Sequence, residues 1–272
     1  MVNRPTALTQ SVEVSGQQLR VSIATGEPGV TPLLLMNGIG ARLELLQPLV
    51  DRLQPRRTIV GFDAPGVGGS PTPLLPYRLT HLSRMVDDML LAVGVDGPVD
   101  VLGISWGGAL AQQFAFTCRS RVRRLVLVAT APGSLMVPAR PHVLAKMITH
   151  RRYDDPEYMA MIAGDIYGGS ARTRGAQIAD SMRTHRSTAD ARGYLYQLGA
   201  GLAWSSLGIL PLISAPTLIL AGTDDPLIPV ANARILHRMV RGSELTLYQG
   251  GHLGLVSEAD ELAPVIEEFL DR

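Results

Sequence analysis

A serine lies between two glycines in the stretch Gly103-Ile-Ser105-Trp-Gly107. The apolar run Val99–Leu102 leads into this stretch, and a helical pattern that starts at Gly108 follows it. A serine on so sharp a strand-to-helix turn has strained backbone angles, so small residues must flank it. The turn exposes the hydroxyl, and the N-terminus of the following helix favours developing negative charge. The pattern predicts Ser105 as a nucleophile.

A serine hydroxyl is a weak nucleophile until a base takes its proton. Of the six histidines, His252 alone comes just after the last expected strand, in the glycine-flanked turn Gly250-Gly-His252. A loop at that place can reach the sheet edge where Ser105 is expected, so His252 is the predicted base. The other five fall on expected helices or on the long helical insertion and are interpreted as ordinary surface or packed residues: His81, His142, His150, His185 and His237.

Two neighbouring carboxylates compete for the role of the acid that orients the base. Asp224 and Asp225 both follow the expected strand Thr217–Ala221, in the chain order Ser, Asp, His that such sites use. In related hydrolases the acid typically lies three residues after a glycine and four before a proline. Asp225 meets both conditions, between Gly222 and Pro229. Asp225 is therefore favoured to fix the imidazole tautomer, and Asp224 remains the alternative, as a turn or hydrogen-bonding residue.

Negative charge that develops on a substrate oxygen needs two backbone N–H donors. One is expected from Trp106, the residue after the nucleophile. The other is expected from Ile39, in the loop Asn37-Gly-Ile-Gly40, where two glycines allow the backbone to approach a substrate closely. Asn37 replaces a commoner histidine in this loop. The alternative interpretation of the loop is a simple tight turn.

The elements around these residues alternate between strand and helix. A hairpin is expected at Ser11–Val14 and Leu19–Thr25, where polar and apolar residues alternate. Further strands are expected at Leu33–Met36, Thr58–Phe62, Val99–Ile104, Leu125–Ala129, Thr217–Ala221 and Leu245–Tyr248. Helices are expected at Leu43–Leu53, Leu79–Val93, Ala109–Cys118, Ala231–Val240 and Asp260–Leu270. This order predicts a mostly parallel, eight-stranded sheet with helices on both faces, similar to the α/β-hydrolase fold.

The alternation stops between about Ser134 and Leu210, where no strand pattern is seen. Four helices are expected in this stretch: Val143–Thr149, Pro156–Ile166, Arg174–Arg183 and Ala191–Ala203. Because the stretch lies between the sixth and seventh strands, it could cover the carboxyl edge of the sheet. We therefore expect a hydrolase core in two parts, residues 1–133 and 211–272, with a helical cap inserted at 134–210.

Composition limits the classes of function. With 46% hydrophobic and 18% charged residues among 272, the chain has enough apolar material for a core and too little charge for disorder. A net charge of +1 does not indicate nucleic acid as a partner. The one tight basic run, Arg119-Ser-Arg-Val-Arg-Arg124, is interpreted as a solvated helix end. Because Cys118 is the single cysteine, no intramolecular disulfide is possible, and a reducing cytoplasm fits.

No cofactor, metal or transmembrane segment is expected. The glycine-rich stretch Asp63–Ser70 lacks the spacing of a phosphate-binding loop and is interpreted as a scaffold turn. The nearest approach to a metal-ligand cluster, His150 with Asp154, Asp155 and Glu157, is interpreted as the polar start of a helix. The longest apolar stretch, Leu207 to Gly222, contains two prolines and is shorter than the roughly 20 residues of a membrane helix. The N-terminus has no apolar core of a signal peptide.

Several stretches together carry a family resemblance. They include Thr31-Pro-Leu-Leu-Leu-Met-Asn-Gly-Ile-Gly-Ala, Phe62-Asp-Ala-Pro-Gly-Val-Gly-Gly-Ser, Ser105-Trp-Gly-Gly-Ala-Leu-Ala-Gln-Gln, Arg151-Arg-Tyr, Ile166-Tyr-Gly-Gly, Ala200-Gly-Leu-Ala-Trp and Asp224-Asp-Pro-Leu-Ile-Pro. Over nearly its whole length the sequence resembles the intracellular depolymerases of medium-chain-length polyhydroxyalkanoates, the storage polyesters of bacterial granules. The Ser105 run and the matches inside the cap are the more specific ones.

The resemblance implies a function and a place in the cell. It implies a triad of Ser105, Asp225 and His252 that cleaves esters between 3-hydroxyacyl units through an acyl-enzyme. It also implies a hydrophobic polyester as the substrate and a cytoplasmic protein that associates with granules. Three alternatives remain: a hydrolase of small soluble esters or carbon–carbon bonds, a cofactor-free haloperoxidase, and a non-catalytic receptor or scaffold.

Overall fold

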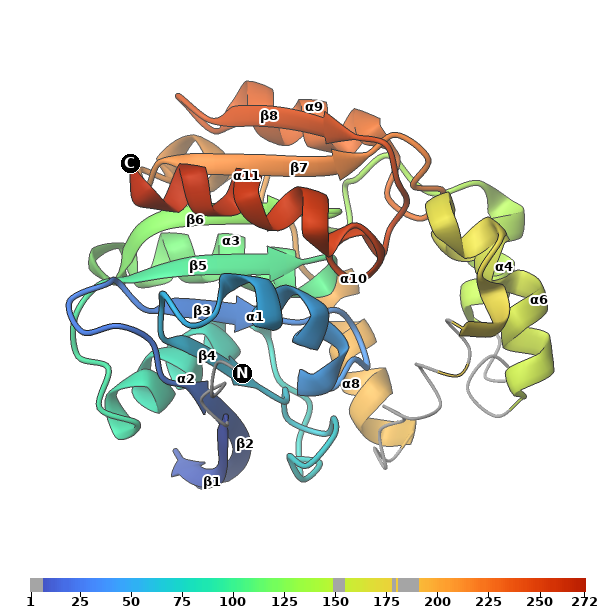
Figure 1. Ribbon diagram of the computed structural model, residues 1–272. Helices are drawn as coiled ribbons and strands as arrows, with labels where there is room; N and C mark the ends of the chain where they lie inside the picture. The colour runs from blue at the N-terminus through green and yellow to red at the C-terminus, as the bar shows by residue number, and fades with distance from the viewer. Residues whose placement is uncertain (1–6, 149–154, 178–179, 181–190) are drawn as a thin grey trace, which may run out of the picture.

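The sheet is the centre of the computed structural model, which describes residues 7–148, 155–177, 180 and 191–272 (Figure 1). Its eight strands run in the order β1-β2-β4-β3-β5-β6-β7-β8. Strands β1 (Leu8–Val14) and β2 (Gln17–Ala24) form an antiparallel hairpin, and β2 pairs antiparallel with β4. The remaining neighbouring pairs are parallel. The predicted mostly parallel, eight-stranded sheet is confirmed.

Most strands begin and end close to where their apolar runs predict. The six strands after the hairpin are β3 (Leu33–Met36), β4 (Ile59–Phe62), β5 (Val99–Ile104), β6 (Val122–Val128), β7 (Thr217–Gly222) and β8 (Glu244–Tyr248). The largest difference is β6, which starts three residues before the predicted Leu125. The added residues at the start of β6 include Arg123 and Arg124, which the sequence pattern assigns to a solvated segment. Arg123 instead pairs with the buried Asp100, and Arg124 lies over the ring of Phe269.

The interpretation of the basic run as a solvated helix end is therefore wrong for part of it. Arg121 is only 9% exposed. Its guanidinium donates to the Asp87 carboxylate at 2.6 Å and to the backbone carbonyls of Val95, Asp96 and Gly97. A guanidinium has five N–H donors, so one buried side chain can satisfy several carbonyls where a chain turns. Arg121 thus closes the loop before β5 instead of facing solvent, whereas Arg119 is exposed.

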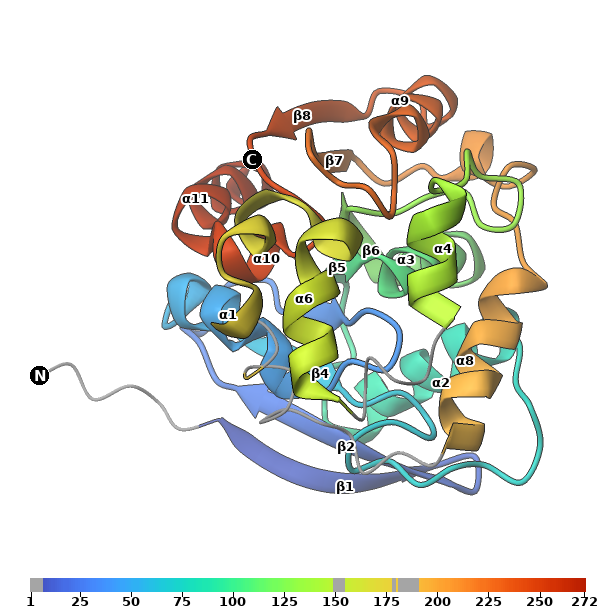
Figure 2. The same cartoon turned by 90° about the vertical axis from the view of Figure 1, so that its right-hand side faces the viewer.

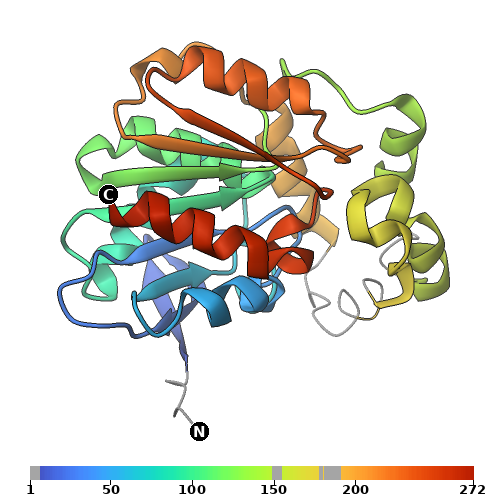
Figure 3. The ribbon, with the colours of Figure 1, turned by 45° about the horizontal axis from the view of Figure 1, so that its top comes forward.

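Helices cover both faces of the sheet (Figure 1, Figure 3). Alternate strand residues point to opposite faces: Leu34 and Met36 of β3 pack in one apolar cluster, and Leu33 and Leu35 in the other. The first cluster includes α2 (Leu79–Ala92), α3 (Trp106–Thr117) and α9 (Val230–Met239), and the second includes α1 (Gln47–Leu53), α10 (Gly254–Ser257) and α11 (Ala259–Asp271). The sheet is thus the middle of three layers.

Two helices differ from their predicted form. The helix expected over Leu43–Leu53 is divided into a 3-10 turn, η1 (Leu43–Leu46), and α1, which starts at Gln47. Pro48 occupies the first turn of α1, where a missing N–H costs least, so the α-helical bonds begin there. The short helix α10 was not expected. It follows directly after His252 and connects the last strand to α11.

Residues 134–210, here called the inserted segment, leave the sheet after β6 and return before β7. Their described helices are α4 (Pro141–Ile148), α6 (Pro156–Tyr167), the 3-10 turn η3 (Gly169–Arg172) and α8 (Ala191–Leu202). Half of the expected helix Arg174–Arg183 lies outside the described residues, and residues 175–177 and 180 are helical. The two ends of the segment meet at an antiparallel bridge between Gly133 and Ser205. Figure 2 shows α4, α6 and α8 in front of the ends of the strands.

Candidate active site

Ser105 occupies the sharp turn between β5 and α3. Its backbone has φ +55° and ψ −119°, angles that a residue with a side chain rarely adopts. The glycines on either side are required by space. A Cβ atom at Gly107 would overlap the carbonyl oxygens of Met36 and Asn37, and one at Gly103 would overlap the Gly107 carbonyl. The residues that leave room for the turn are therefore the two glycines that the sequence pattern singles out.

The predicted base and the predicted nucleophile lie within hydrogen-bond distance of each other. His252 Nε2 is 3.0 Å from Ser105 Oγ, and His252 Nδ1 is 2.8 Å from Asp225 Oδ2. The side chains of His252 and Asp225 are 5% and 1% exposed, so water scarcely competes for these bonds. The turn that carries His252 is braced from both sides. The His252 N–H donates to the Tyr167 carbonyl at 2.7 Å, and the Tyr248 hydroxyl donates to the Gly251 carbonyl at 3.0 Å.

The two adjacent carboxylates have different surroundings. Asp225 Oδ1 accepts hydrogen bonds from the N–H groups of Leu227 and Ile228, at 2.9 and 2.8 Å, which leaves Oδ2 for the imidazole. Asp224 instead accepts from Arg172 and from the Gly169 N–H, both in the inserted segment. The hydrogen bond with Arg172 is the main cause that lowers the pKa of Asp224. Of the two competing residues, the structure places Asp225 on His252.

The loop that follows β3 approaches Ser105 closely. A Cβ atom at Gly38 would lie 3.7 Å from the Ser105 Cβ. In this loop Gly38 N–H donates to the Asn37 side chain and Gly40 N–H donates to Gln197 Oε1. Among the described residues, the Ile39 N–H has no hydrogen-bond partner.

The second expected donor is at the start of a helix. Trp106 is the first residue of α3, so its N–H has no carbonyl one turn earlier in the helix to bond. Ile39, in the loop beside Ser105, and Trp106, the residue after it, thus each have a backbone N–H without a hydrogen-bond partner among the described residues. Such a pair can stabilise an oxyanion.

Three residues around the site were not singled out from the sequence. The Thr130 hydroxyl, just after β6, donates to the Ser105 carbonyl at 2.7 Å and helps to hold the strained turn. The Tyr167 ring is stacked on the His252 ring, with centroids 6.2 Å apart. Gln197 of α8 bonds the Ile39 loop. No local spacing marks Thr130 or Gln197, whereas Tyr167 belongs to a stretch, Ile166-Tyr-Gly-Gly, that carries the family resemblance.

The remaining histidines have other surroundings. His237 Nδ1 is 3.0 Å from the Ser243 hydroxyl, while His81 and His142 are exposed. His150, Asp154 and His185 lie outside the described residues. Among the residues that are described, no group of three or more histidine, cysteine or carboxylate side chains could hold a metal ion. In the same part of the chain, no helix is both long and apolar enough to cross a membrane.

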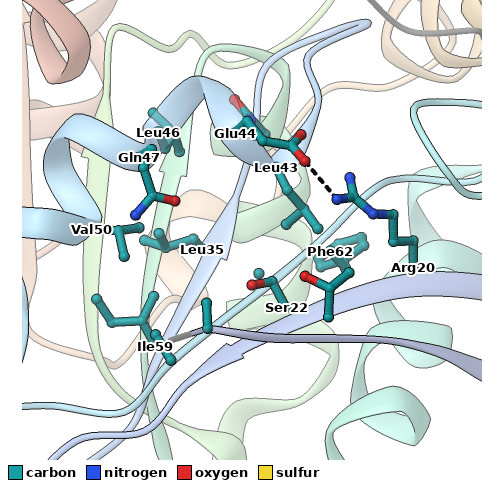
Figure 4. Close-up of a pocket in the computed structure, with 15 residues that line it drawn as sticks. Arg20, Ser22, Leu35, Leu43, Glu44, Leu46, Gln47, Val50, Ile59 and Phe62 are labelled. Carbon is teal, nitrogen blue, oxygen red and sulfur yellow. Dashed lines mark hydrogen bonds and ion pairs between the residues drawn. The ribbon is translucent and has the colours of Figure 1, made fainter. Parts of the chain in front are cut away.

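A hollow on the α1 face of the sheet is separate from this site (Figure 4). Its volume is about 110 Å³, and it is lined by the hairpin, β3, β4 and the start of α1. Arg20 and Glu44 form an ion pair at its edge, with 2.5 Å between Nη2 and Oε1. Neither Ser105 nor His252 lines it. It does not take part in the arrangement described above.

The family of the chain follows from comparison with known proteins. A family model described as alpha/beta hydrolase fold matches residues 31–259. The chain belongs to this family. Among curated relatives, this α/β hydrolase is similar to a poly(3-hydroxyalkanoate) depolymerase from Ectopseudomonas oleovorans, with 44% identity over 97% of the chain and 92% of the relative. The family resemblance predicted from the motifs is thereby confirmed.

More distant relatives share the fold and catalyse other reactions. A pimeloyl-[acyl-carrier protein] methyl ester esterase from Stenotrophomonas maltophilia is 26% identical over 88% of this α/β hydrolase and 92% of the esterase. The crystal structure of the enol-lactonase from Burkholderia xenovorans LB400 superposes with a TM-score of 0.82, at 22% identity over 97% of this chain and 100% of the lactonase. At that identity the superposition supports the fold alone.

Proposed function

We propose that this α/β hydrolase is a serine ester hydrolase that cleaves medium-chain-length poly(3-hydroxyalkanoate) or its oligomers through an acyl-enzyme. The observation that carries the proposal is the continuous series of contacts from Ser105 Oγ through His252 to Asp225, at 3.0 and 2.8 Å. The similarity to the depolymerase supports the substrate class, because it extends over 97% of the chain and so includes the inserted segment.

In the first half of the reaction, Ser105 Oγ attacks the ester carbonyl carbon while His252 Nε2 takes the hydroxyl proton. The carbonyl electron pair moves to oxygen, and the N–H groups of Ile39 and Trp106 stabilise the resulting oxyanion. When this intermediate collapses, the carbon–oxygen bond to the leaving unit breaks and His252 returns the proton to the leaving hydroxyl oxygen. Asp225 holds the imidazole in the required tautomer and stabilises its protonated form.

In the second half, water replaces the leaving unit. The water oxygen attacks the acyl carbon while His252 takes a proton from the water. The oxyanion that forms in this step is stabilised by the same two N–H donors. Collapse breaks the bond to Ser105 Oγ, which recovers its proton from His252. The products are two shorter pieces of the polyester. One ends in a new carboxyl group, and the other ends in a new hydroxyl group. The substrate and one water molecule supply every atom that these steps need.

The inserted segment is proposed to act as a cap, with residues 1–133 and 211–272 forming the two parts of the core. Its α6 and η3 contain an apolar cluster of their own, with Met159, Ile162 and Ile166 each 3% exposed or less, which also includes Leu253 beside His252. A cap with this packing presents an apolar environment next to the triad. Such an environment suits an alkyl side chain better than a charged substrate.

The proposed substrate class implies a dependence on chain length. Each buried methylene contributes about 0.8 kcal/mol, a factor of about four in kcat/KM when the contact is made in the transition state. Changing the side chain of the repeating unit from methyl to pentyl adds four methylenes, so a preference on the order of 10²-fold is expected. We therefore expect ready hydrolysis of medium-chain polymer and slow hydrolysis of poly(3-hydroxybutyrate).

We also propose that the protein works in the cytoplasm at the surface of polyester granules. Leu74 and Leu75, in the loop before α2, are 90% and 76% exposed. Leu195 of α8 is 60% exposed, and the neighbouring Tyr196 hydroxyl donates to the Leu74 carbonyl at 3.5 Å, so these side chains belong to one region. Neighbouring exposed apolar side chains favour adsorption to an apolar surface. Replacing Leu74 and Leu75 with serine should reduce co-sedimentation with granules and leave turnover of soluble esters unchanged.

The decisive experiment supplies medium-chain polymer and poly(3-hydroxybutyrate) as amorphous granules of matched size and follows release of 3-hydroxy acid. Ser105→Ala serves as the control for the mechanism, and it should remove nearly all hydrolysis while the protein stays folded. Equal rates on the two polymers would contradict the medium-chain assignment. Turnover of small soluble esters with no release from either polymer would instead favour a small-ester hydrolase, the activity of the methyl ester esterase relative.

A further inference from the structure

Gln197, on α8 of the inserted segment, contacts both elements that carry the candidate oxyanion donors. Its Oε1 accepts a hydrogen bond from the Gly40 N–H at 2.7 Å. Its backbone carbonyl accepts one from the Trp106 indole Nε1 at 2.8 Å. The residue is only 1% exposed. One buried residue of the inserted segment is thus bonded to the Ile39 loop on one side and to the Trp106 side chain on the other.

We propose that Gln197 is a positioning residue for the oxyanion site, an inference that rests on the function proposed above. It does not touch the reacting atoms. Its bond to the Gly40 N–H holds the peptide that joins Ile39 to Gly40. Ile39 is thereby kept at a fixed place relative to Trp106. The inserted segment would then complete the catalytic machinery as well as cover it.

Within the loop itself, the Ala41 N–H donates to the Gly38 carbonyl at 3.2 Å and closes a turn over Ile39 and Gly40. Gly40 has a φ of +66°, and a glycine on either side of Ile39 leaves the backbone many alternative conformations. The Asn37 side chain fixes the start of the loop through the Gly38 N–H and the Arg42 carbonyl. Near its middle, the Gly40 N–H is held by Gln197. Without that acceptor, the part-buried Gly40 N–H would lose its partner and the loop would adopt other conformations.

The expected consequence is kinetic. An oxyanion donor acts only at about 2.7–3.1 Å from the developing charge, and removing one donor outright lowers kcat by about 10²–10³-fold. Displacing a donor that is still present should cost less. Loss of the Gln197 amide is therefore expected to lower kcat by about 10–100-fold. KM should change little, because the neutral ester carbonyl binds these donors weakly in the ground state.

The test compares Gln197→Met with Gln113→Met. Both positions are buried glutamines whose side-chain Oε1 accepts one N–H at 2.7 Å, that of Gly40 for Gln197 and that of the Trp204 indole for Gln113. Gln113 therefore matches the loss of a buried hydrogen bond without contacting the Ile39 loop. Four quantities are measured: kcat and KM on p-nitrophenyl octanoate, the melting temperature, and the inhibition constant of an octyl trifluoromethyl ketone. Ser105 Oγ adds to that ketone, His252 takes the proton, and the carbonyl oxygen becomes an oxyanion in the site.

The expected result is that Gln197→Met lowers kcat and raises the inhibition constant of the ketone by the same factor. Gln113→Met should lower only the melting temperature. If Gln197→Met does not fold, Gln197→Asn, whose amide is too short to reach Gly40, should show the same pattern. Unchanged kcat and ketone affinity, or equal losses in both methionine variants, would overturn the inference. Ser105→Ala separates this from failure of the proposed function: activity that survives in Ser105→Ala rejects the function, whereas an inactive Ser105→Ala beside a fully active Gln197→Met rejects only the role of Gln197.

Discussion

Arg172 and Asp224 form a two-point ion pair, with Nε to Oδ2 at 2.6 Å and Nη2 to Oδ1 at 2.7 Å. Oδ2 also accepts the Gly169 N–H at 2.7 Å. Arg172 and Gly169 belong to the inserted segment, and Asp224 precedes Asp225 in the loop after β7. Since the Tyr167 carbonyl accepts the His252 N–H, the same short stretch of the inserted segment is bonded to the loops of both Asp225 and His252. Asp224 thus has a structural role next to the proposed catalytic one of its neighbour.

The first prediction separates the two carboxylates. Asp225→Asn should lower kcat by about 10³–10⁴-fold, because an amide at this position no longer fixes the imidazole tautomer. Asp224→Asn should cost far less, since its ion pair with Arg172 lies outside the series from Ser105 to Asp225. Steady-state kinetics of the two variants on one soluble ester give the ranking. The reverse ranking would transfer the acid role to Asp224.

The second prediction concerns the pH dependence of the Arg172–Asp224 pair. The pKa of Asp224 is lowered in the folded state, first by the Arg172 hydrogen bond. A lowered folded pKa means that the pair stabilises the fold above the ordinary aspartate pKa of about 3.9, and that this stabilisation is lost as the pH falls through the folded value. Arg172→Met should therefore lower the melting temperature at neutral pH, and the difference from wild type should shrink below about pH 4. Both side chains are nearly half exposed, so the loss is expected to be at most about 1 kcal/mol.

The control for Arg172→Met is Arg52→Met. Arg52 pairs with Asp260 at 2.7 Å, and this exposed pair contacts neither catalytic loop. Both substitutions remove an arginine that lowers the pKa of its partner. Arg172→Met should also reduce kcat, through looser placement of the loops of Asp225 and His252, whereas Arg52→Met should leave kcat unchanged. Equal kcat in the two variants would show that the Arg172 pair has no influence on the site.

Much of this arrangement could be predicted because it depends on local chemistry. Buried parallel strands need continuous apolar runs, and the turn at Ser105 needs its two glycines, so both leave a pattern in neighbouring residues. The preference for Asp225 over Asp224 came from spacing to Gly222 and Pro229, and the structure places Asp225 on His252.

The contacts that could not be predicted join residues far apart in the chain. The Gly40–Gln197 bond spans 157 positions, and nothing near Gln197 distinguishes it from a glutamine on any helix surface. Thr130 has no distinguishing pattern either, because the sequence indicates only that it follows the end of a strand. The early start of β6 was missed because Arg123 has an internal partner, Asp100, that only the folded chain brings near it. From the sequence alone, a charged side chain is predicted to be exposed to solvent, because a buried partner of opposite charge cannot be identified.

The third prediction tests the close packing around the nucleophile turn. A Cβ at Gly107 would overlap two backbone oxygens, which cannot move without disturbing β3 and the Ile39 loop. Gly107→Ala should therefore destabilise the fold by at least about 2 kcal/mol and abolish activity. The matched control is Gly199→Ala on α8, where a Cβ meets nothing within 4 Å. That variant should raise stability by about 0.5–1 kcal/mol, because alanine favours a helix over glycine. Chemical denaturation of both variants measures the two effects, and a stable, active Gly107→Ala would contradict the packing argument.

The last prediction concerns Cys118, the single cysteine, at the end of α3. Burial is the main cause that raises the pKa of its thiol to about 11. The thiolate is the reactive form, so at pH 8 its population is far smaller than that of a free cysteine with a pKa of about 8.5. The greater intrinsic nucleophilicity of a high-pKa thiolate offsets part of this loss, and the native protein should react with iodoacetamide about ten- to a hundredfold more slowly than glutathione. Unfolding in urea should restore the ordinary rate, which serves as the control. If iodoacetamide inhibits wild type and Cys118→Ala at the same rate, another nucleophile is being alkylated. His252 would then be the first residue to examine.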